Sequence, residues 1–251
     1  MNLTKTIDLN CDMGEGMFTD ADIMPFISSA NIACGYHAGD NDTMRHTIDL
    51  CLQHKVAIGA HPGFKDKENF GRLNQQLSNQ ELQDLVSEQL HILLQFCKEA
   101  GATLHHVKPH GALYNMAAKN QHMSSILAKA VYEFDSNLLY YGLSNSFMIT
   151  EAKKIGLKTV NEVFADRTYQ VDGSLTPRSE KNALIEDTAT ALAQVMQMIQ
   201  VNTVKTIQGK EISLHPQTIC LHGDGAHAVD FAKVIHQTLK NSSVHIQAPA
   251  N

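Results

Sequence analysis

The sequence predicts an α/β fold, a parallel barrel built from seven β/α units. Two observations predict it: short apolar runs alternate with amphipathic helical patterns, and no linker, low-complexity tract or short repeat divides the 251 residues. Strands separated by helices pair in parallel through right-handed crossovers, because only this connection lets each helix cover the sheet. Seven such units indicate a barrel, complete or incomplete, in a single domain of residues 1–251.

Seven short apolar runs are the predicted strands. Runs of this kind, with helical patterns between them, are typical of strands in a parallel sheet. They cover residues 6–12, 30–35, 56–60, 105–109, 138–141, 158–164 and 218–222.

The best predicted helix covers residues 78–100. Ser78 and Glu81 form a capping box at its start, and Gly101 supplies a stop at its end. Its apolar positions repeat with the period of one buried helix face, at Leu82, Leu85, Val86, Leu90, Leu93 and Cys97. Weaker helical patterns cover residues 42–54, 124–134, 144–155, 180–200 and 226–239.

One segment departs from the alternation of strand and helix. Residues 201–217 hold two short alternating runs on either side of Gly209 and Lys210. We therefore expect a β-hairpin inserted ahead of the last strand.

Charge and cysteine content exclude several classes of partner. The net charge is −6 without any lysine or arginine run, so the chain lacks the basic stripe that nucleic-acid binding requires. No apolar stretch is long enough to cross a bilayer, and the first ten residues lack the apolar core of a signal peptide. The five cysteines form no CxxC pair and mostly lie in apolar segments, which favours free thiols in a reducing, cytoplasmic setting.

Strand alternation places polar side chains inside the predicted barrel. Residues two apart on a strand share a face, so apolar Ile7 and Leu9 turn toward the helices. The same parity turns polar groups inward from several strands: Asp8, Asn10, Asp12, His61, His106, Lys108, His110 and His222. In "HPGF" and "KPHG" a proline then removes a ladder donor and a glycine permits a sharp turn, which places these strand ends at the mouth of the barrel.

Inward polar groups from several strands predict one shared site. A single histidine or aspartate at a strand end is more often a hydrogen-bonded structural residue. Burying a polar group without a partner costs roughly 2–7 kcal/mol, so groups gathered at one end need mutual compensation. Because barrel active sites lie at the carboxyl ends of the strands, we favour a shared site over unrelated structural residues.

Six long motifs resemble one known family. They are "DLNCDMGEG", "SANIACGYHAGD", "GAHPGF" with "FGR", "VKPHGALYN", "NEVFADRTYQVDGSLTPR" and "CLHGD". In this order they cover nearly the whole chain and resemble the LamB/YcsF family, the A subunits of bacterial 5-oxoprolinase. The resemblance implies an irregular seven-stranded, TIM-like barrel related to glycoside hydrolases and polysaccharide deacetylases. It also implies ATP-dependent opening of the lactam 5-oxo-L-proline to L-glutamate, together with B and C partner subunits.

The expected catalytic groups of such a reaction are Asp12, Lys108 and His110. Asp12 ends the first strand at the mouth, where a carboxylate can act as general base or metal ligand. Lys108 and Arg167 are candidates to hold an anion, either the substrate carboxylate or a phosphoryl group, and Arg72 is a weaker candidate. His110 is expected to act beside Asp12 and Lys108.

A divalent metal is one of two hypotheses for the histidines. His61 and His110 could bind zinc or a similar ion together with Asp12 or Asp8, like the Asp-His-His site of deacetylase barrels. The alternative is metal-free proton transfer or substrate hydrogen bonding by the same histidines. No ligand pair lies at close spacing on one element, so the sequence leaves both hypotheses open.

A further group of polar residues is expected to contact substrate or phosphate. It consists of Asn10, His37, Arg167, Glu162, Asp166 and His222, with Asp40 and Asp224 beside them. The chain has no GxxxxGK[ST] motif, so ATP would bind partly on a partner subunit or here in an unusual way.

Two other functions compete with lactam opening. The barrel and its Asp and His content also suit a metal-dependent deacetylase or carbohydrate hydrolase, although fold analogy alone is weak support. A non-catalytic scaffold that docks the B and C subunits is the third hypothesis. We disfavour it because a scaffold would fill its barrel with aliphatic layers.

Overall fold

Seven parallel strands close into a barrel in the computed structural model, which describes residues 5–221 and 228–250. The strands are β1 (Thr6–Met13), β2 (Ser29–Ala33), β3 (Ala57–His61), β4 (Leu104–Val107), β5 (Leu139–Leu143), β6 (Thr159–Phe164) and β9 (Thr218–Leu221). Each pairs in parallel with the next, and β9 pairs with both β6 and β1, which closes the ring. The predicted seven-stranded barrel is confirmed.

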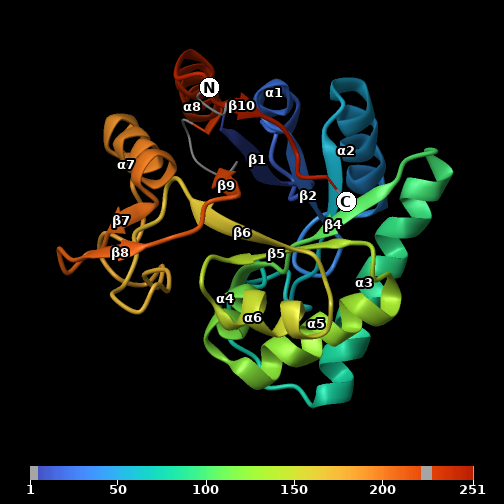
Figure 1. The fold of residues 1–251 in the computed structure, drawn as a ribbon. Helices are drawn as coiled ribbons and strands as arrows, with labels where there is room; N and C mark the ends of the chain where they lie inside the picture. Colours follow the sequence, from blue (N-terminus) through green and yellow to red (C-terminus); the bar gives the residue numbers. More distant parts are fainter. Residues whose placement is uncertain (1–4, 222–227, 251) are drawn as a thin grey trace.

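Helices cover the outside of this barrel (Figure 1). They are α1 (Asp20–Ile23), the 3-10 turn η1 (Met24–Phe26), α2 (Asn41–His54), α3 (Asn79–Glu99), α4 (Gly111–Lys119), α5 (Gln121–Phe134), α6 (Phe147–Lys154), α7 (Thr188–Val201) and α8 (Ala228–Asn241). The outward strand residues Ile7, Leu9 and Cys11 are all buried beneath them. No helix in the described part of the chain combines the length and apolarity needed to span a membrane.

Several helices differ from the sequence prediction: α1 and α4 are not predicted, and α5, α6 and α7 begin at other residues than predicted. Helix α7 begins at Thr188, not near residue 180, because the Asp187 carboxylate accepts from Thr190 N at 2.8 Å and caps the helix there. Helix α4 is absent from the prediction, since the proline and glycine of "KPHG" indicate a turn. The turn exists at Gly111, whose φ is +53°, and the helix starts directly from it.

Short strands lie outside the barrel circuit. β7 (Thr203–Lys205) and β8 (Glu211–Ser213) form an antiparallel hairpin, which lies beside α7 at the left of Figure 1. β10 (His245–Ile246) pairs in parallel with the amino end of β1. The single-domain organisation of residues 1–251 stays a prediction.

Candidate active site

Asp8 lies deep in the barrel and accepts hydrogen bonds from four hydroxyl groups. Ser28 Oγ (2.6 Å), Ser29 Oγ (2.8 Å), Thr218 Oγ1 (2.6 Å) and Tyr141 OH (3.0 Å) all donate to its carboxylate. Burial raises the pKa of Asp8, while these four hydrogen bonds oppose the rise. These four hydroxyl groups satisfy the Asp8 carboxylate at the base of the barrel, away from the polar groups at its mouth.

Lys108 is a buried cation surrounded by acceptors. Its Nζ lies 2.8 Å from Asp12 Oδ1, 2.8 Å from Glu162 Oε1, 3.1 Å from Asn10 Oδ1 and 3.1 Å from Cys220 Sγ. Burial alone would lower the pKa of Lys108, but Asp12, Cys220 and Glu162 raise it well above its usual range. The lysine therefore stays charged, and Glu162, with no exposed surface, lies beneath it and not in contact with solvent.

Asn31 completes the environment of Asp12. Its Nδ2 donates to Asp12 Oδ1 at 2.9 Å, and its Oδ1 accepts from His106 Nε2 at 2.8 Å. Asp12 Oδ1 is thus held by two donors, Asn31 and Lys108. The other oxygen, Oδ2, lies 3.3 Å from His61 Nε2 at the mouth.

His61 and His110 have their tautomers fixed by backbone carbonyls. A carbonyl can only accept, so His61 Nδ1 donates to Lys108 O at 2.7 Å and His110 Nε2 donates to Phe70 O at 2.8 Å. Their remaining nitrogens, His61 Nε2 and His110 Nδ1, lie 2.9 Å apart. When both rings are neutral, each of these two facing nitrogens carries a lone pair, and the two lone pairs repel each other. A cation or a proton between the nitrogens relieves this repulsion.

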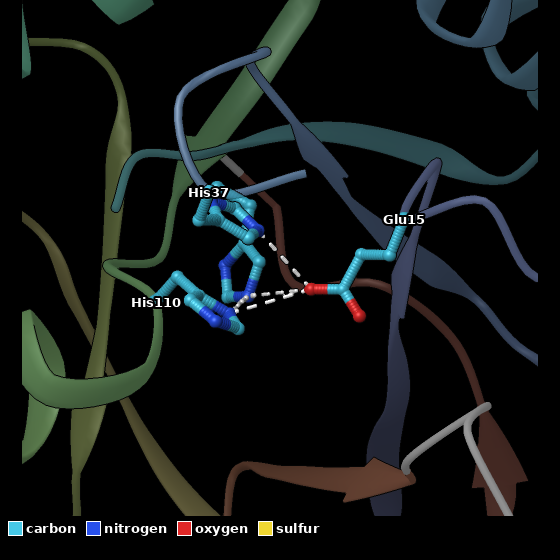
Figure 2. Close-up of side chains that lie close together, drawn as sticks. Glu15, His37 and His110 are labelled. Carbon is cyan, nitrogen blue, oxygen red and sulfur yellow. Dashed lines mark hydrogen bonds and ion pairs between the residues drawn. The ribbon is translucent and has the colours of Figure 1, made fainter. Parts of the chain in front are cut away.

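Glu15 and His37 complete the cluster at the mouth. Glu15 Oε1 lies 3.2 Å from His37 Nε2, 3.3 Å from His110 Nδ1 and 4.0 Å from His61 Nε2. Figure 2 shows Glu15 reaching from the segment after β1 toward His37 and His110. The rings of His37 and His110 are stacked at 3.7 Å. Burial, together with the neighbouring imidazoles, holds the pKa of His37 and of His110 well below its usual range, so both histidines are neutral.

Two glycines make room for these rings. A Cβ on Gly63 would lie 2.6 Å from His37 Nδ1, which is closer than real contacts allow. Gly71 has a φ of +62°, and a Cβ there would lie 2.8 Å from His37 Cβ. The glycines of "GAHPGF" and "FGR" therefore permit the close packing of the imidazoles.

The mouth cluster fits a divalent metal ion. One ligand atom from each of Glu15, His37, His61 and His110 lies within 4.8 Å of the others. Imidazole and carboxylate ligands suit zinc, and backbone acceptors already orient two of the rings as in many metal sites. Asp12 Oδ2 borders the same space through His61. Asp8, expected as an alternative ligand, is not a member of this cluster.

The other predicted residues lie around the cluster or outside it. The Arg167 guanidinium donates to Thr176 O at 2.6 Å and Ala183 O at 3.3 Å, so it braces the loop after β6. Burial, and then the charge of Arg178, lowers the pKa of Arg167 to about 10, while neighbouring Asp166 opposes this. His222 and Asp224 lie outside the described residues.

Two further predicted residues lie at the rim. The Asp40 carboxylate caps α2 by accepting from Thr43 N at 2.8 Å. The exposed Arg72 guanidinium lies 4.8 Å from the ring centroid of Phe70, next to His110 in the structure.

Two residues of the site, Glu15 and Asn31, are absent from the sequence prediction. Glu15 is the second residue beyond the end of β1, where strand alternation no longer predicts side-chain direction. Its sequence signal is an acid between Gly14 and Gly16 just after a strand. Both glycines have positive φ, +68° and +88°. Asn31 does have a parity signal, because it alternates with buried Ala30 and Ile32 in "SANIACG".

The fold and site together define a class: a closed parallel β/α barrel whose ionisable cluster lies at the carboxyl ends of the strands, where barrel enzymes carry their active sites. The sequence also matches the family model of LamB/YcsF over residues 7–251. The chain belongs to the LamB/YcsF family.

Curated relatives resemble the chain over nearly its full length. It is 51% identical to a Bacillus cereus protein named as the A subunit of 5-oxoprolinase, covering 97% of this chain and 99% of that protein. It is 53% identical to the protein of the same name from Shouchella clausii, covering 97% of this chain and 98% of that one.

Solved structures agree with the fold. The lactam utilization protein of Thermus thermophilus superposes with a TM-score of 0.91 at 36% identity, covering 97% of this chain and 100% of that one. The peptidoglycan deacetylase PdaC of Bacillus subtilis matches with a TM-score of 0.52 at 12% identity, covering 97% of this chain and 87% of that one. This second likeness shows the fold alone.

Proposed function

We propose that this chain is the A subunit of an ATP-dependent 5-oxoprolinase, which cleaves 5-oxo-L-proline to L-glutamate and couples this to hydrolysis of ATP to ADP and phosphate. Relatives at 51% and 53% identity bear that name, and a solved relative is named for lactam utilization. A name that designates one lettered subunit supports a complex with B and C partners. The observation that carries the proposal is the convergence of Asp12, His61, Lys108 and His110 on one mouth.

The reaction requires activation of a weak electrophile. A lactam is an amide, and its ring carbon resists attack by water near neutral pH. Phosphorylation of the lactam oxygen by ATP would release ADP and make the ring carbon more electrophilic. Water would then add to this carbon, the C–N bond would break as the nitrogen takes up a proton, and hydrolysis of the resulting acyl phosphate by a second water would release phosphate and leave glutamate. The protein must then accept a proton from the water and bind anionic groups.

Asp12 is the proposed general base. Lys108 and Asn31 hold its Oδ1, while its Oδ2 faces His61 and the mouth. Lys108 and Asn31 hold this carboxylate in one orientation, so we assign Lys108 to positioning Asp12 instead of direct contact with an anion. His110 would then contact substrate or share a cation with His61.

A divalent metal is the proposed cofactor of the mouth cluster, in addition to ATP. His61 and His110, with Glu15, His37 or Asp12, would hold it. When bound, such an ion polarises a carbonyl or phosphoryl oxygen or lowers the pKa of water. The facing lone pairs of His61 and His110 support this proposal over the metal-free alternative, because burial disfavours protonation of His110.

The other predicted site residues are proposed to support the site or to contact the substrate. Arg167 and Asp166 would shape the loop beside the substrate, Asn10 and Glu162 would support Lys108 from beneath, and His37 would line the mouth. His222 would contact substrate or phosphate from the end of β9. Five free, buried cysteines favour a reducing cytoplasmic setting for the enzyme.

A metal-dependent deacetylase is the second candidate function. The imidazole–carboxylate cluster is the specific observation that favours it, because this ligand set suits hydrolysis assisted by a metal alone. The scaffold hypothesis fits less well, because a buried lysine with two carboxylates costs stability that aliphatic packing would avoid.

The discriminating experiment is a coupled assay of the purified chain, first alone and then with B and C subunits. The expected result is formation of ADP and glutamate that depends on 5-oxoproline and on all three subunits. Turnover of N-acetylated sugars without ATP would instead support the deacetylase. Absence of 5-oxoproline-dependent ADP in the complete mixture would contradict the proposed function.

A further inference from the structure

Two consecutive histidines of β4, His105 and His106, connect the segment after β10 to the proposed base. Their Nδ1 atoms lie 3.0 Å apart and share one hydrogen bond. At one end of the pair, His105 Nε2 lies 2.9 Å from the carbonyl oxygen of Pro249. At the other end, His106 Nε2 lies 2.8 Å from Oδ1 of Asn31, whose amide nitrogen holds Asp12.

The orientation of the Asn31 amide decides which of its atoms faces His106. Asn31 Nδ2 lies 2.9 Å from Asp12 Oδ1 and 2.7 Å from Asn10 Oδ1. Both oxygens also accept from Lys108 Nζ, which can only donate, so neither oxygen has a proton to give. The atom that faces them is therefore the amide nitrogen of Asn31. Its oxygen faces His106, so His106 Nε2 must donate.

Three hydrogen bonds then give a proton count for the two rings. The Pro249 carbonyl only accepts, so His105 Nε2 carries one proton. His106 Nε2 carries a second proton for Asn31 Oδ1. One of the two Nδ1 atoms must carry a third, because two lone pairs form no hydrogen bond. Two neutral imidazoles hold only two protons, so the pair carries one positive charge.

The extra proton belongs to His105. The His106 ring has no exposed surface, and burial, followed by the charge of His105, holds the pKa of His106 well below its usual range. His105 is only partly buried. The plane of the His106 ring is also fixed, because the ring stacks on Tyr141 at 4.2 Å and a Cβ on Gly59 would lie 2.1 Å from its Nε2.

We propose that His105 is a positioning residue of the active site, an imidazolium that donates to Pro249 and to His106 and so fixes the tautomer that holds Asn31 against Asp12. This role rests on the proposed function, because it acts through the proposed base. The segment after β10 takes part, since Pro249 supplies the carbonyl that requires the second N–H of His105. In Figure 1 this segment is the red trace that runs from β10 to the mark C near β4.

NMR spectroscopy of the full chain with isotope-labelled histidine counts these protons. Near neutral pH, His105 should carry a proton on both ring nitrogens and His106 on Nε2 alone, with a scalar coupling between the two Nδ1 nuclei across their hydrogen bond. A neutral His105 ring, or a proton on His106 Nδ1, overturns the proposal. The measurement needs no assay of lactam opening, so the proton count is tested even if the proposed function fails.

Two substitutions of nearly equal shape separate hydrogen-bond donation from bulk. The amide of His105→Gln can still donate to His106 Nδ1, so kcat of the reconstituted complex should stay within about threefold of wild type. The carboxylate of His105→Glu can only accept. Because burial disfavours a charged His106, its proton should move from Nε2 to Nδ1, which leaves Asn31 Oδ1 without a donor. Asn31 then turns away from Asp12, and kcat should fall about tenfold or more while KM changes less than about twofold.

The matched control for the added charge is His245→Glu. His245 lies on β10 with an exposed ring that contacts Gln247, so this variant should keep the kcat of wild type. Equal kcat for His105→Gln and His105→Glu overturns the positioning role. A wild-type complex that opens no lactam contradicts the proposed function instead, so the two failures are distinguishable.

Discussion

At the scale of single residues, the facing nitrogens of His61 and His110 most clearly need a group between them. The two atoms lie 2.9 Å apart. Each ring already donates its other N–H to a carbonyl, so neither neutral ring can donate to the other. A proton between them is disfavoured by burial, which lowers the pKa of His110. A metal ion between the two nitrogens would compensate both lone pairs.

We therefore expect the purified protein to bind one zinc-like ion. His61→Gln and His110→Gln should each weaken zinc affinity by more than about tenfold, because each removes a ligand nitrogen. Competition titration with a metallochromic chelator measures this, and His91→Gln on the exposed face of α3 is the matched control. Equal zinc affinity in all three variants, or lactam opening that is indifferent to chelation, would rule out the metal site.

Lys108 is the second residue on which the site depends, because its ammonium group pairs with both Asp12 and Glu162 inside the barrel. Lys108→Met should destabilise the fold by about 3–5 kcal/mol, since it leaves buried carboxylates unpaired. Urea unfolding measures the change. Adding Glu162→Gln to Lys108→Met should recover part of the loss, and a double variant less stable than the single one would show that this pairing is not the cause.

At the scale of elements, local signals predict some boundaries well. The α3 prediction differs by one residue at each end, because Ser78 and Glu81 form the capping box that the sequence indicates. The predicted start of helix α7 is too early, because residues 180–187 fit a helical pattern but belong to the loop that Arg167 braces. Such tertiary hydrogen bonds have no local sequence signal.

The candidate site is predictable where strand parity applies. Counting residues along strands places Asp12, His61 and Lys108 inside the mouth. Parity ends with the strand, so it does not find Glu15, whose position depends on the turn through Gly14 and Gly16. The short distances among the rings depend on packing across separate loops, which no single segment encodes.

The β3–α3 loop controls the position of His37. Gly63→Ala should lower lactam-opening activity by about tenfold or more, because its methyl group would overlap His37 Nδ1 at 2.6 Å. The backbone of Gly63 does not have positive φ, so the effect is steric and not due to strain. Activity of the reconstituted complex measures it. Near-wild-type activity of the complex assembled with Gly63→Ala would contradict the steric explanation.

At the scale of the whole molecule, closure of the barrel brings the polar side chains of distant strands together. Pairing of β9 with β1 closes the ring, and the end of β9 supplies Cys220 beside Lys108. Alternation of strands and helices predicts the barrel, whereas the two-residue strand β10 is too short to produce a sequence pattern. Closure also buries titratable groups, which makes folding dependent on pH.

Stability should fall as the pH falls below about 6.5, the ordinary pKa of histidine. Burial lowers the pKa of His37, His106 and His110 well below that value, so the unfolded chain binds more protons in this range. The stabilisation is present above the unfolded pKa and is lost on acidification, by up to about 1.4 kcal/mol per pH unit for each histidine.

Urea unfolding between pH 7.5 and pH 5.5, with chelator present, checks this slope. His106→Gln should reduce the slope by about one histidine's share, since glutamine can still donate to Asn31 but does not titrate. An unfolding free energy that is constant or rises on acidification would contradict neutral burial of these rings.

The central claim is that the groups at the mouth perform the reaction, with Asp12 as base. Asp12→Asn is the most direct test, because asparagine keeps the oxygen that accepts from Lys108 and Asn31 and removes only the charge. We predict that this variant folds and joins the complex normally. The resulting complex should form no glutamate from 5-oxoproline above the background rate. Near-normal turnover by that complex would contradict the account.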